Sequence, residues 1–224
     1  MFNKEADFEK ALIALLATKS WEKEVLLYPT EEELIANWQE HLDKTNQHID
    51  KLDVPLLRTE MNQILEQVQA LKTPYALNGF INGKTVAIKR ENEKSRHFGK
   101  EVSLDIFDRE EISAGKSRYQ IAQQPRFSPR SDLYPKQRGD LMLLINGMPM
   151  FHIELKRSSV PISQATYQIE RYHKAGAFSG IFSLVQVFVA MTPEECRYFA
   201  NTSGQLNPAF YFRWADFNNV YMNE

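Results

Sequence analysis

Residues 138–172 read RGDLMLLINGMPMFHIELKRSSVPISQATYQIERY and carry the strongest structural signals in the chain. Two apolar runs flank Asn146-Gly147, a residue pair that favours the tight turn of a β-hairpin. The second run is followed by a helix-like segment over 164–175, which Ser163 can cap and Gly176 can end. The pattern therefore predicts a strand, a turn, a second strand and then a helix lying over the hairpin.

Charged residues lie at the start of the first predicted strand and at the end of the second. Asp140 precedes the first apolar run, and Glu154 and Lys156 end the second. Because side chains alternate along a strand, Glu154 and Lys156 share one face, where burial is costly unless the charges have partners or a function. A divalent cation would remove the repulsion between two carboxylates, and Mg²⁺ is held by such groups together with substrate oxygens. The spacing favours metal-dependent phosphate chemistry, with Lys156 as a point charge beside the metal; a solvated strand end is the alternative interpretation.

The register of the hairpin decides whether these carboxylates meet. A two-residue turn at Asn146-Gly147 would put Asp140 and Glu154 on opposite faces, whereas a three-residue turn with a bulge at Gly147 would set them opposite each other. We therefore expect a bulged turn, or a bend at Gly139.

These residues resemble a known nuclease signature. Asp140, Glu154-Leu155-Lys156 and Gln168-x-x-x-Tyr172 look like the PD-(D/E)xK motif with the QxxxY extension of RecB-like nucleases. The wording RGDLMLLINGMPMFHIELK resembles most closely the N-terminal nuclease domain of the type I restriction enzyme R (HsdR) subunit. Flanking segments EVSLDIFD, YQIAQQPRF and FYFRWADFNN extend the resemblance over residues 80–218. Gly139 stands where the family has proline, which removes no ligand.

The resemblance implies an α/β fold with a PD-(D/E)xK restriction-endonuclease-like core, a mixed central β-sheet flanked by helices. We expect residues 1–75 to form a helical region packed on a nuclease core over 76–224. Asp140, Glu154 and Lys156 are the predicted catalytic residues. Both carboxylates and the backbone carbonyl of Leu155 are the predicted ligands of Mg²⁺.

Supporting residues are expected on two helices. Gln168 and Tyr172 lie four apart on the helix after the hairpin, and we expect them to touch DNA phosphates or to hold Lys156 in place. The inward face of that helix is predicted to be polar, formed by Gln164, Gln168, Arg171 and Tyr172. The resemblance also makes Glu9, on an early helix, a candidate near the metal, although a solvated surface glutamate is the stronger interpretation.

The implied function is Mg²⁺-dependent hydrolysis of double-stranded DNA within a restriction–modification system. Methylation and specificity subunits would be partners, and S-adenosylmethionine would bind to those partners. No helicase motif occurs, so we expect a fragment of a longer translocase subunit, and ATP would belong to its motor domains. One alternative is a RecB-like nuclease of repair or CRISPR adaptation, which the lack of a cysteine cluster disfavours. Another is a non-catalytic DNA-binding or subunit-docking module of the same fold.

Composition agrees with a single large globular unit. The chain has 224 residues, 43% of them apolar, and a net charge of −2. No apolar run could span a membrane, no signal peptide opens the chain, and the one cysteine, Cys196, fits a reducing compartment, so we expect a cytoplasmic protein. Residues 1–70 are acidic, whereas residues 116–138 hold six basic residues and one acid. This asymmetry predicts a local phosphate-binding face.

The basic segment 125–138, PRFSPRSDLYPKQR, is predicted to be a long loop without regular structure. Arg126, Arg130 and Arg138 are its candidate DNA contacts, with aromatic residues between them that suit backbone or base contacts. A packed connecting loop with exposed arginines is an equal alternative.

The remaining pattern predicts helices over 5–19, 31–43 and 51–71, the second with a capping box formed by Thr30 and Glu33. It also predicts a hairpin over 76–90 turning at Asn82-Gly83, strands over 102–107, 119–123, 182–191 and 210–214, and a short helix over 193–200 capped by Thr192. Strands 150–156 and 184–190 should be parallel neighbours. Residues 114–117 end like a phosphate-binding loop, but Glu110 replaces the required first glycine, which argues against ATP binding.

Overall fold

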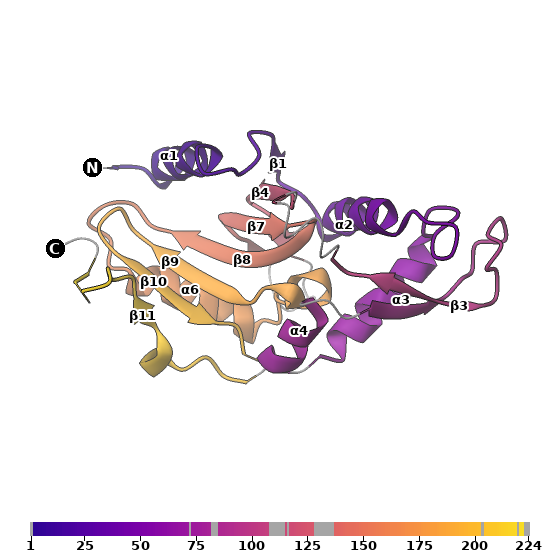
Figure 1. The fold of residues 1–224 in the computed structure, drawn as a ribbon. Coiled ribbons are helices and arrows are strands. Elements are labelled where there is room, and N and C mark those ends of the chain that lie inside the picture. Colours follow the sequence, from indigo (N-terminus) through magenta and orange to yellow (C-terminus); the bar gives the residue numbers. More distant parts are fainter. Residues whose placement is uncertain are drawn as a thin grey trace.

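The computed structural model describes residues 2–71, 73–81, 85–107, 115, 117–127, 137–202, 204–218 and 220–221. Within these ranges the main sheet has seven strands in the order β1-β4-β7-β8-β9-β10-β11 (Figure 1). Their bounds are β1 Val25–Leu27, β4 Tyr119–Gln123, β7 Leu141–Ile145, β8 Met148–Leu155, β9 Val187–Met191, β10 Cys196–Ala200 and β11 Phe212–Arg213. The pairs β1–β4 and β8–β9 are parallel and the others antiparallel, which confirms an α/β class with a mixed sheet.

Helices cover both faces of the sheet (Figure 1). Helix α1 (Glu5–Ala17) packs Phe8 and Leu12 against one face, together with Leu141, Leu143 and Ile153. The opposite face carries α2 (Glu31–Asn46), α3 (Arg58–Gln69), α4 (Pro74–Ile81), α6 (Ser163–Lys174) and the 3₁₀ helix η1 (Gly180–Leu184). Alternating side chains of the strands thus enter two separate apolar clusters.

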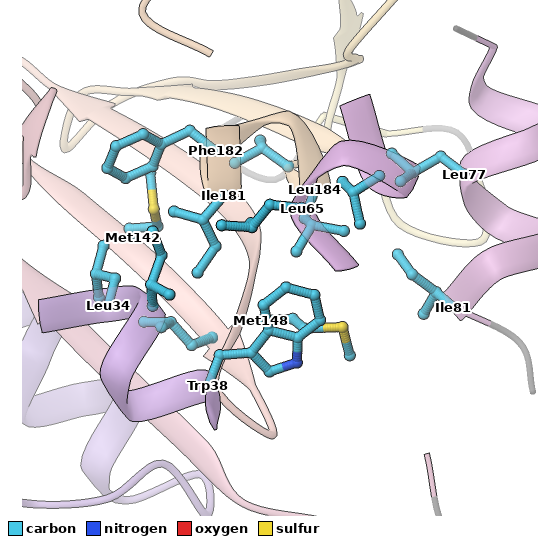
Figure 2. Packing of buried hydrophobic residues seen from close by; sticks show 14 of the residues in the cluster. Leu34, Trp38, Leu65, Leu77, Ile81, Met142, Met148, Ile181, Phe182 and Leu184 are labelled. Atoms are coloured by element: carbon cyan, nitrogen blue, oxygen red, sulfur yellow. The ribbon is translucent and has the colours of Figure 1, made fainter. Parts of the chain in front are cut away.

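The larger cluster joins the second layer of helices to the hairpin (Figure 2). Trp38 of α2 and Met148 of β8 are fully buried there, beside Ile181 and Leu184 of η1. A separate two-stranded sheet, β2 (Thr85–Lys89) with β3 (Glu101–Asp105), packs against α2 and α3. A buried ion pair of Arg90 and Glu60, 2.9 Å apart, fastens the end of β2 to α3.

The central hairpin sets Asp140 opposite Glu154 as expected, but the bulge that does so lies in β8 and not in the turn. Ile145 pairs with Met148 across a strict two-residue turn, in which Asn146 and Gly147 have φ values of 50° and 80°. The predicted bulge at Gly147 is therefore wrong. The extra residue is Met150, because Leu144 pairs with Pro149 while Leu143 pairs with Phe151. Continued by one position beyond Leu141 and Ile153, this register sets Asp140 opposite Glu154.

The tight turn is enforced by packing as well as by sequence. A Cβ atom at Gly147 would lie 2.8 Å from the Cα atom of Trp38, in addition to facing the unfavourable positive φ. The turn therefore packs closely against α2, and the register of the hairpin changes within β8 instead.

Several other predictions are confirmed. The Thr30–Glu33 capping box begins α2, β4 spans 119–123, α1 lies within its expected range, and β3 overlaps the strand expected over 102–107. Strands β8 and β9 are parallel neighbours joined through α6, and β11 is an edge strand near the end of the chain.

Several predicted elements are wrong. The strand expected over 182–191 begins only at Val187, because residues 180–184 form the 3₁₀ helix η1. Residues 74–81 form helix α4, and β2 pairs with β3 rather than with residues 76–81; the proposed turn at Asn82-Gly83 lies outside the described residues. The segment 193–200 holds strand β10, because Thr192 accepts hydrogen bonds from the backbone of 194 and 195 in a turn that leads back along β9. Helix α3 begins only at Arg58.

A further correction concerns the basic segment 125–138, which was expected to be a loop without regular structure. Its described ends form a short ribbon of β5 (Arg126–Phe127) with β6 (Gln137–Arg138). Arg130, and residues 114 and 116 of the phosphate-loop-like segment 114–117, lie outside the described residues. No helix in the described part of the chain is long and apolar enough to cross a bilayer.

Candidate active site

The structure brings Asp140, Glu154 and Lys156 together where β7 begins and β8 ends. The Oδ2 atom of Asp140 accepts a hydrogen bond of 2.7 Å from the backbone N–H of Leu155. The Nζ atom of Lys156 lies 3.7 Å from Oε1 of Glu154. The hydrogen bond between Leu155 and Asp140 ties the residue before β7 to the last residue of β8. The bulge at Met150 sets the register of these two strands, and with it the geometry of the three charged groups.

Burial governs the protonation of both carboxyl groups. Burial, and then the charge of Glu154, raises the pKa of Asp140 to about 7. Burial likewise raises the pKa of Glu154 to about 7, against the opposing effect of Lys156. The side chain of Glu154 is fully buried, and neither carboxylate oxygen has an aligned hydrogen-bond partner among the described residues. Such a pair of carboxylates favours either a proton or a cation between them.

Lys156 folds back over its own strand. Its ammonium donates a 2.7 Å hydrogen bond to the carbonyl of Leu155, the group predicted to be a metal ligand. That carbonyl retains a second lone pair for another partner. The ammonium also lies 3.8 Å from Oε1 of Glu5 on α1, a contact that the sequence interpretation missed. The sequence signal that could have predicted this contact is the spacing of Glu5 and Glu9, which lie one helical turn apart on α1.

Glu9 is buried rather than solvated, so the surface interpretation is wrong. It accepts a hydrogen bond of 3.1 Å from the side chain of Gln124, and burial raises its pKa, with a further contribution from the charge of Asp140. Gln124 adopts a positive φ of 53° and donates its backbone N–H to the Asp140 carbonyl, 2.7 Å away. Gln124 therefore links α1 to the start of β7.

Gln168 and Tyr172 form a relay toward the backbone before Asp140. The amide of Gln168 donates to the hydroxyl of Tyr172 at 2.7 Å, and that hydroxyl donates to the carbonyl of Arg138 at 2.8 Å. Burial raises the pKa of Tyr172 to about 12, so its hydroxyl stays protonated and able to donate. Among the described contacts, neither residue bonds to Lys156.

The predicted polar inward face of α6 is wrong. Ala165, Ile169 and Tyr172 point inward and are buried, whereas Gln164 and Arg171 are exposed. Gln168 lies at the boundary of the buried face, which is why it reaches Tyr172 rather than the strand.

A cavity of about 870 Å³ opens onto this cluster. Arg126 and Arg138 are directly paired across the β5–β6 ribbon, and both line the cavity. Like charges directly opposite each other are unfavourable unless an anion or a counter-charge lies nearby. The remaining lining residues come from α1, the start of α2, the β5–β6 ribbon, the hairpin and α6: Glu5, Thr30, Glu31, Phe127, Gln137, Asp140, Lys156, Gln168 and Tyr172.

His152 is a second residue that the sequence interpretation missed. It precedes Glu154 on the same face of β8, is fully buried, and places Nε2 3.3 Å from Oε2 of Glu154. Burial lowers its pKa to about 4, so the ring is neutral at pH 7. The described residues contain no group of three or more His, Cys, Asp or Glu side chains arranged to hold a metal, so a cation here would rely on two carboxylates, backbone and non-protein oxygens.

Comparison with known proteins adds a family to this geometry. The family model described as "Type I restriction enzyme R protein N terminus" matches residues 3–207. The endonuclease subunit of the type I restriction enzyme SauMSSORF170P of Staphylococcus aureus is 30% identical over 85% of this chain. The SsaAORF53P endonuclease subunit of Staphylococcus saprophyticus is 28% identical over the whole chain.

These relatives are much longer proteins. The matched region spans 19% of the Staphylococcus aureus subunit and 22% of the Staphylococcus saprophyticus subunit. The EcoprrI endonuclease subunit of Escherichia coli, 27% identical over the whole chain, is covered to 67%. The similarity therefore concerns one region of a larger subunit.

Proposed function

The chain belongs to the family of type I restriction enzyme R protein N-termini, and on that premise we propose that it is the metal-dependent endonuclease region of such a subunit. The observation that supports this most is the buried pair Asp140 and Glu154 with Lys156 beside it. A PD-(D/E)xK core is the corresponding proposal for the fold. In this proposed core, the hairpin, helix α6 and helix α1 place the residues of the site at one end of the sheet.

The donor set fits a hard divalent cation. Asp140, Glu154 and the Leu155 carbonyl supply oxygen atoms only, as Mg²⁺ prefers. Among the described residues the carboxylate oxygens of Glu154 have no aligned hydrogen-bond partner, and a cation would supply one. When bound, Mg²⁺ would supply Lewis-acid stabilisation of phosphate charge and a lowered pKa of water. The charge of Asp140 contributes to the raised pKa of Glu9, and we propose Glu9 as an outer member of the site.

The residues around the carboxylates have separate tasks in this proposal. Lys156 neutralises charge developing on the phosphate, as a compact point charge on a flexible stem. Gln168 and Tyr172 hold the Arg138 carbonyl and thereby fix the backbone that carries Asp140. This assigns them a positioning role, in place of the expected contact with Lys156.

The substrate we propose is double-stranded DNA, entering the cavity beside the paired arginines. Arg126 and Arg138 suit the phosphate backbone, since guanidinium groups bind phosphate oxygens in a bidentate manner. Arg130 is kept as a candidate from the sequence alone. No base-reading element is assigned, so sequence recognition would belong to a specificity subunit and modification to a methylation subunit of a restriction–modification complex. ATP would act in motor domains of the parent subunit.

A plasmid-nicking assay tests the proposal. With Mg²⁺ present, the chain should convert supercoiled plasmid to nicked or linear DNA, and EDTA should stop the reaction. Asp140→Ala should lose activity by at least about 100-fold, because a charge-stabilising group of the reaction centre is removed. Asp50→Ala, at a side chain 83% exposed, serves as the matched control and should behave as wild type.

Equal nicking by wild type and Asp140→Ala would contradict the proposal and favour a non-catalytic docking module. Nicking that persists in EDTA would contradict the metal dependence alone.

A further inference from the structure

His152 is caged by aromatic rings behind the proposed site. Its ring centroid lies 5.2 Å from that of Phe178, 5.7 Å from Phe127, 6.2 Å from Tyr172 and 6.3 Å from Phe188. The imidazole is fully buried and does not line the cavity. It is therefore out of reach of a substrate that enters beside the arginines.

The cage does not explain why the residue is a histidine. Neither ring nitrogen has an aligned hydrogen-bond partner among the described residues. A buried polar group without a partner is destabilising, and a phenyl or aliphatic side chain would suit four aromatic neighbours better. A histidine at this position points to a task for one of its nitrogens.

Within the described part of the chain, the carboxylate of Glu154 lies close to the imidazole. The Nε2 atom is 3.3 Å from Oε2 of Glu154, although the two atoms are not aligned as a hydrogen bond. The other edge of the ring faces Gly139: a Cβ atom there would lie 2.5 Å from Cε1 and 3.1 Å from Nδ1. The glycine before Asp140 thus leaves the space that the imidazole occupies.

We propose that His152 is a positioning residue for Glu154, holding its carboxylate toward Asp140 by donating the Nε2 proton. The inference rests on the proposed function, because it matters only if Glu154 binds a cation. A neutral imidazole behind a ligating carboxylate orients it without adding positive charge beside the cation. Gly139 and the aromatic cage fix the ring, so the direction of its donor is fixed as well.

Three substitutions of His152 separate hydrogen bonding through Nε2 from packing within the aromatic cage. Glutamine can place an amide donor near the position of Nε2, whereas asparagine can place one only near Nδ1, on the side of Gly139. Leucine keeps the apolar bulk and removes both donors. Isothermal titration of the metal-free chain with Mn²⁺ should show about tenfold weaker binding for His152→Leu and His152→Asn, the scale expected for lost second-sphere support. His152→Gln should bind within about threefold of wild type.

A measurement without metal completes the test. Long-range ¹H–¹⁵N NMR of the metal-free wild type should find the neutral proton of His152 on Nε2. Circular dichroism verifies that each variant is folded, and His152→Gln keeps the test valid if the leucine variant is not.

The outcomes are distinct. A proton on Nδ1, equal Mn²⁺ affinity in wild type and His152→Leu, or failure of His152→Gln to exceed His152→Asn would overturn the role of His152 and leave the proposed function standing. Unchanged Mn²⁺ affinity in Glu154→Ala would overturn the proposed function, and the inference with it.

Discussion

Two carboxyl groups, Asp140 and Glu154, are held in a buried site at the cost of their hydration, and Asp140 also faces the charge of Glu154. Hydrogen bonding from the Leu155 backbone and the nearby ammonium of Lys156 offset only part of this cost, because both carboxyls keep a pKa near 7. In unfolded chains the same groups titrate near pH 4. The metal-free site is thus a local source of instability, as is common where a fold is arranged for binding.

This instability has a definite pH dependence. Between about pH 4 and pH 7 the folded state binds more protons than the unfolded state, so the free energy of unfolding should fall as pH rises and level off above pH 7. Asp140→Asn keeps the acceptor for the Leu155 N–H and removes one charge. In EDTA at pH 8, we expect urea titration to find this variant more stable than wild type by about 1 kcal/mol.

At pH 5 the difference should shrink, since both carboxyls of the wild type are then largely protonated. Asp50→Asn, at an exposed position, should show no such pattern. A variant Asp140→Asn that is less stable than wild type at pH 8 would show that the carboxylate is already satisfied without metal.

At the scale of elements, the hairpin and α6 set the site. The sequence allowed the charged residues to be predicted, since their spacing along two apolar runs is local information. It did not locate the bulge, because Gly147 packs against α2, more than 100 residues earlier in the chain, and such a contact cannot be predicted from local sequence. Glu9 was misjudged for the same reason: its burial depends on Gln124, which only the folded chain brings near.

Helix α6 offers a test of the relay. Tyr172→Phe removes the hydroxyl that bonds to the Arg138 carbonyl and leaves the ring in place, so we expect a loss of about 1 kcal/mol in stability and a loss of cleavage of tenfold or more. Gln168→Ala should lose cleavage as well. Tyr167→Phe, on the exposed side of the same helix, is the control. Full cleavage by both Gln168→Ala and Tyr172→Phe would refute the positioning role.

The β5–β6 ribbon offers a test of the proposed DNA contacts. If Arg126 and Arg138 contact phosphates, Arg126→Ala/Arg138→Ala should weaken binding to all DNA sequences alike and reduce the log–log salt slope by about two units, at about 0.9 per contact. A salt titration of DNA affinity measures this slope. The double variant Lys94→Ala/Lys100→Ala, exposed near the β2–β3 sheet, should leave it unchanged. An unaltered slope in the arginine variant would mean that these side chains serve packing.

At the scale of the whole molecule, the sheet brings distant segments to one point. The candidate site takes Glu5 and Glu9 from the first helix, Arg126 and Arg138 from the ribbon, and its carboxylates from the central hairpin. Local patterns predicted α1, α2, β4 and the parallel pair β8–β9. A helix and a strand were confused at α4 and β10. Short apolar segments there fit either element equally well, and tertiary pairing decides between them.

The most direct test of the account is a crystal structure of the metal-free chain soaked with Mn²⁺, with anomalous scattering recorded to locate the ion. We predict a single strong anomalous peak between the carboxylates of Asp140 and Glu154, within bonding distance of both, and no peak there in Asp140→Ala. A peak that persists in the variant, or Mn²⁺ bound only elsewhere in the wild type, would contradict the proposed metal site and with it the assignment of this cluster as the nuclease centre.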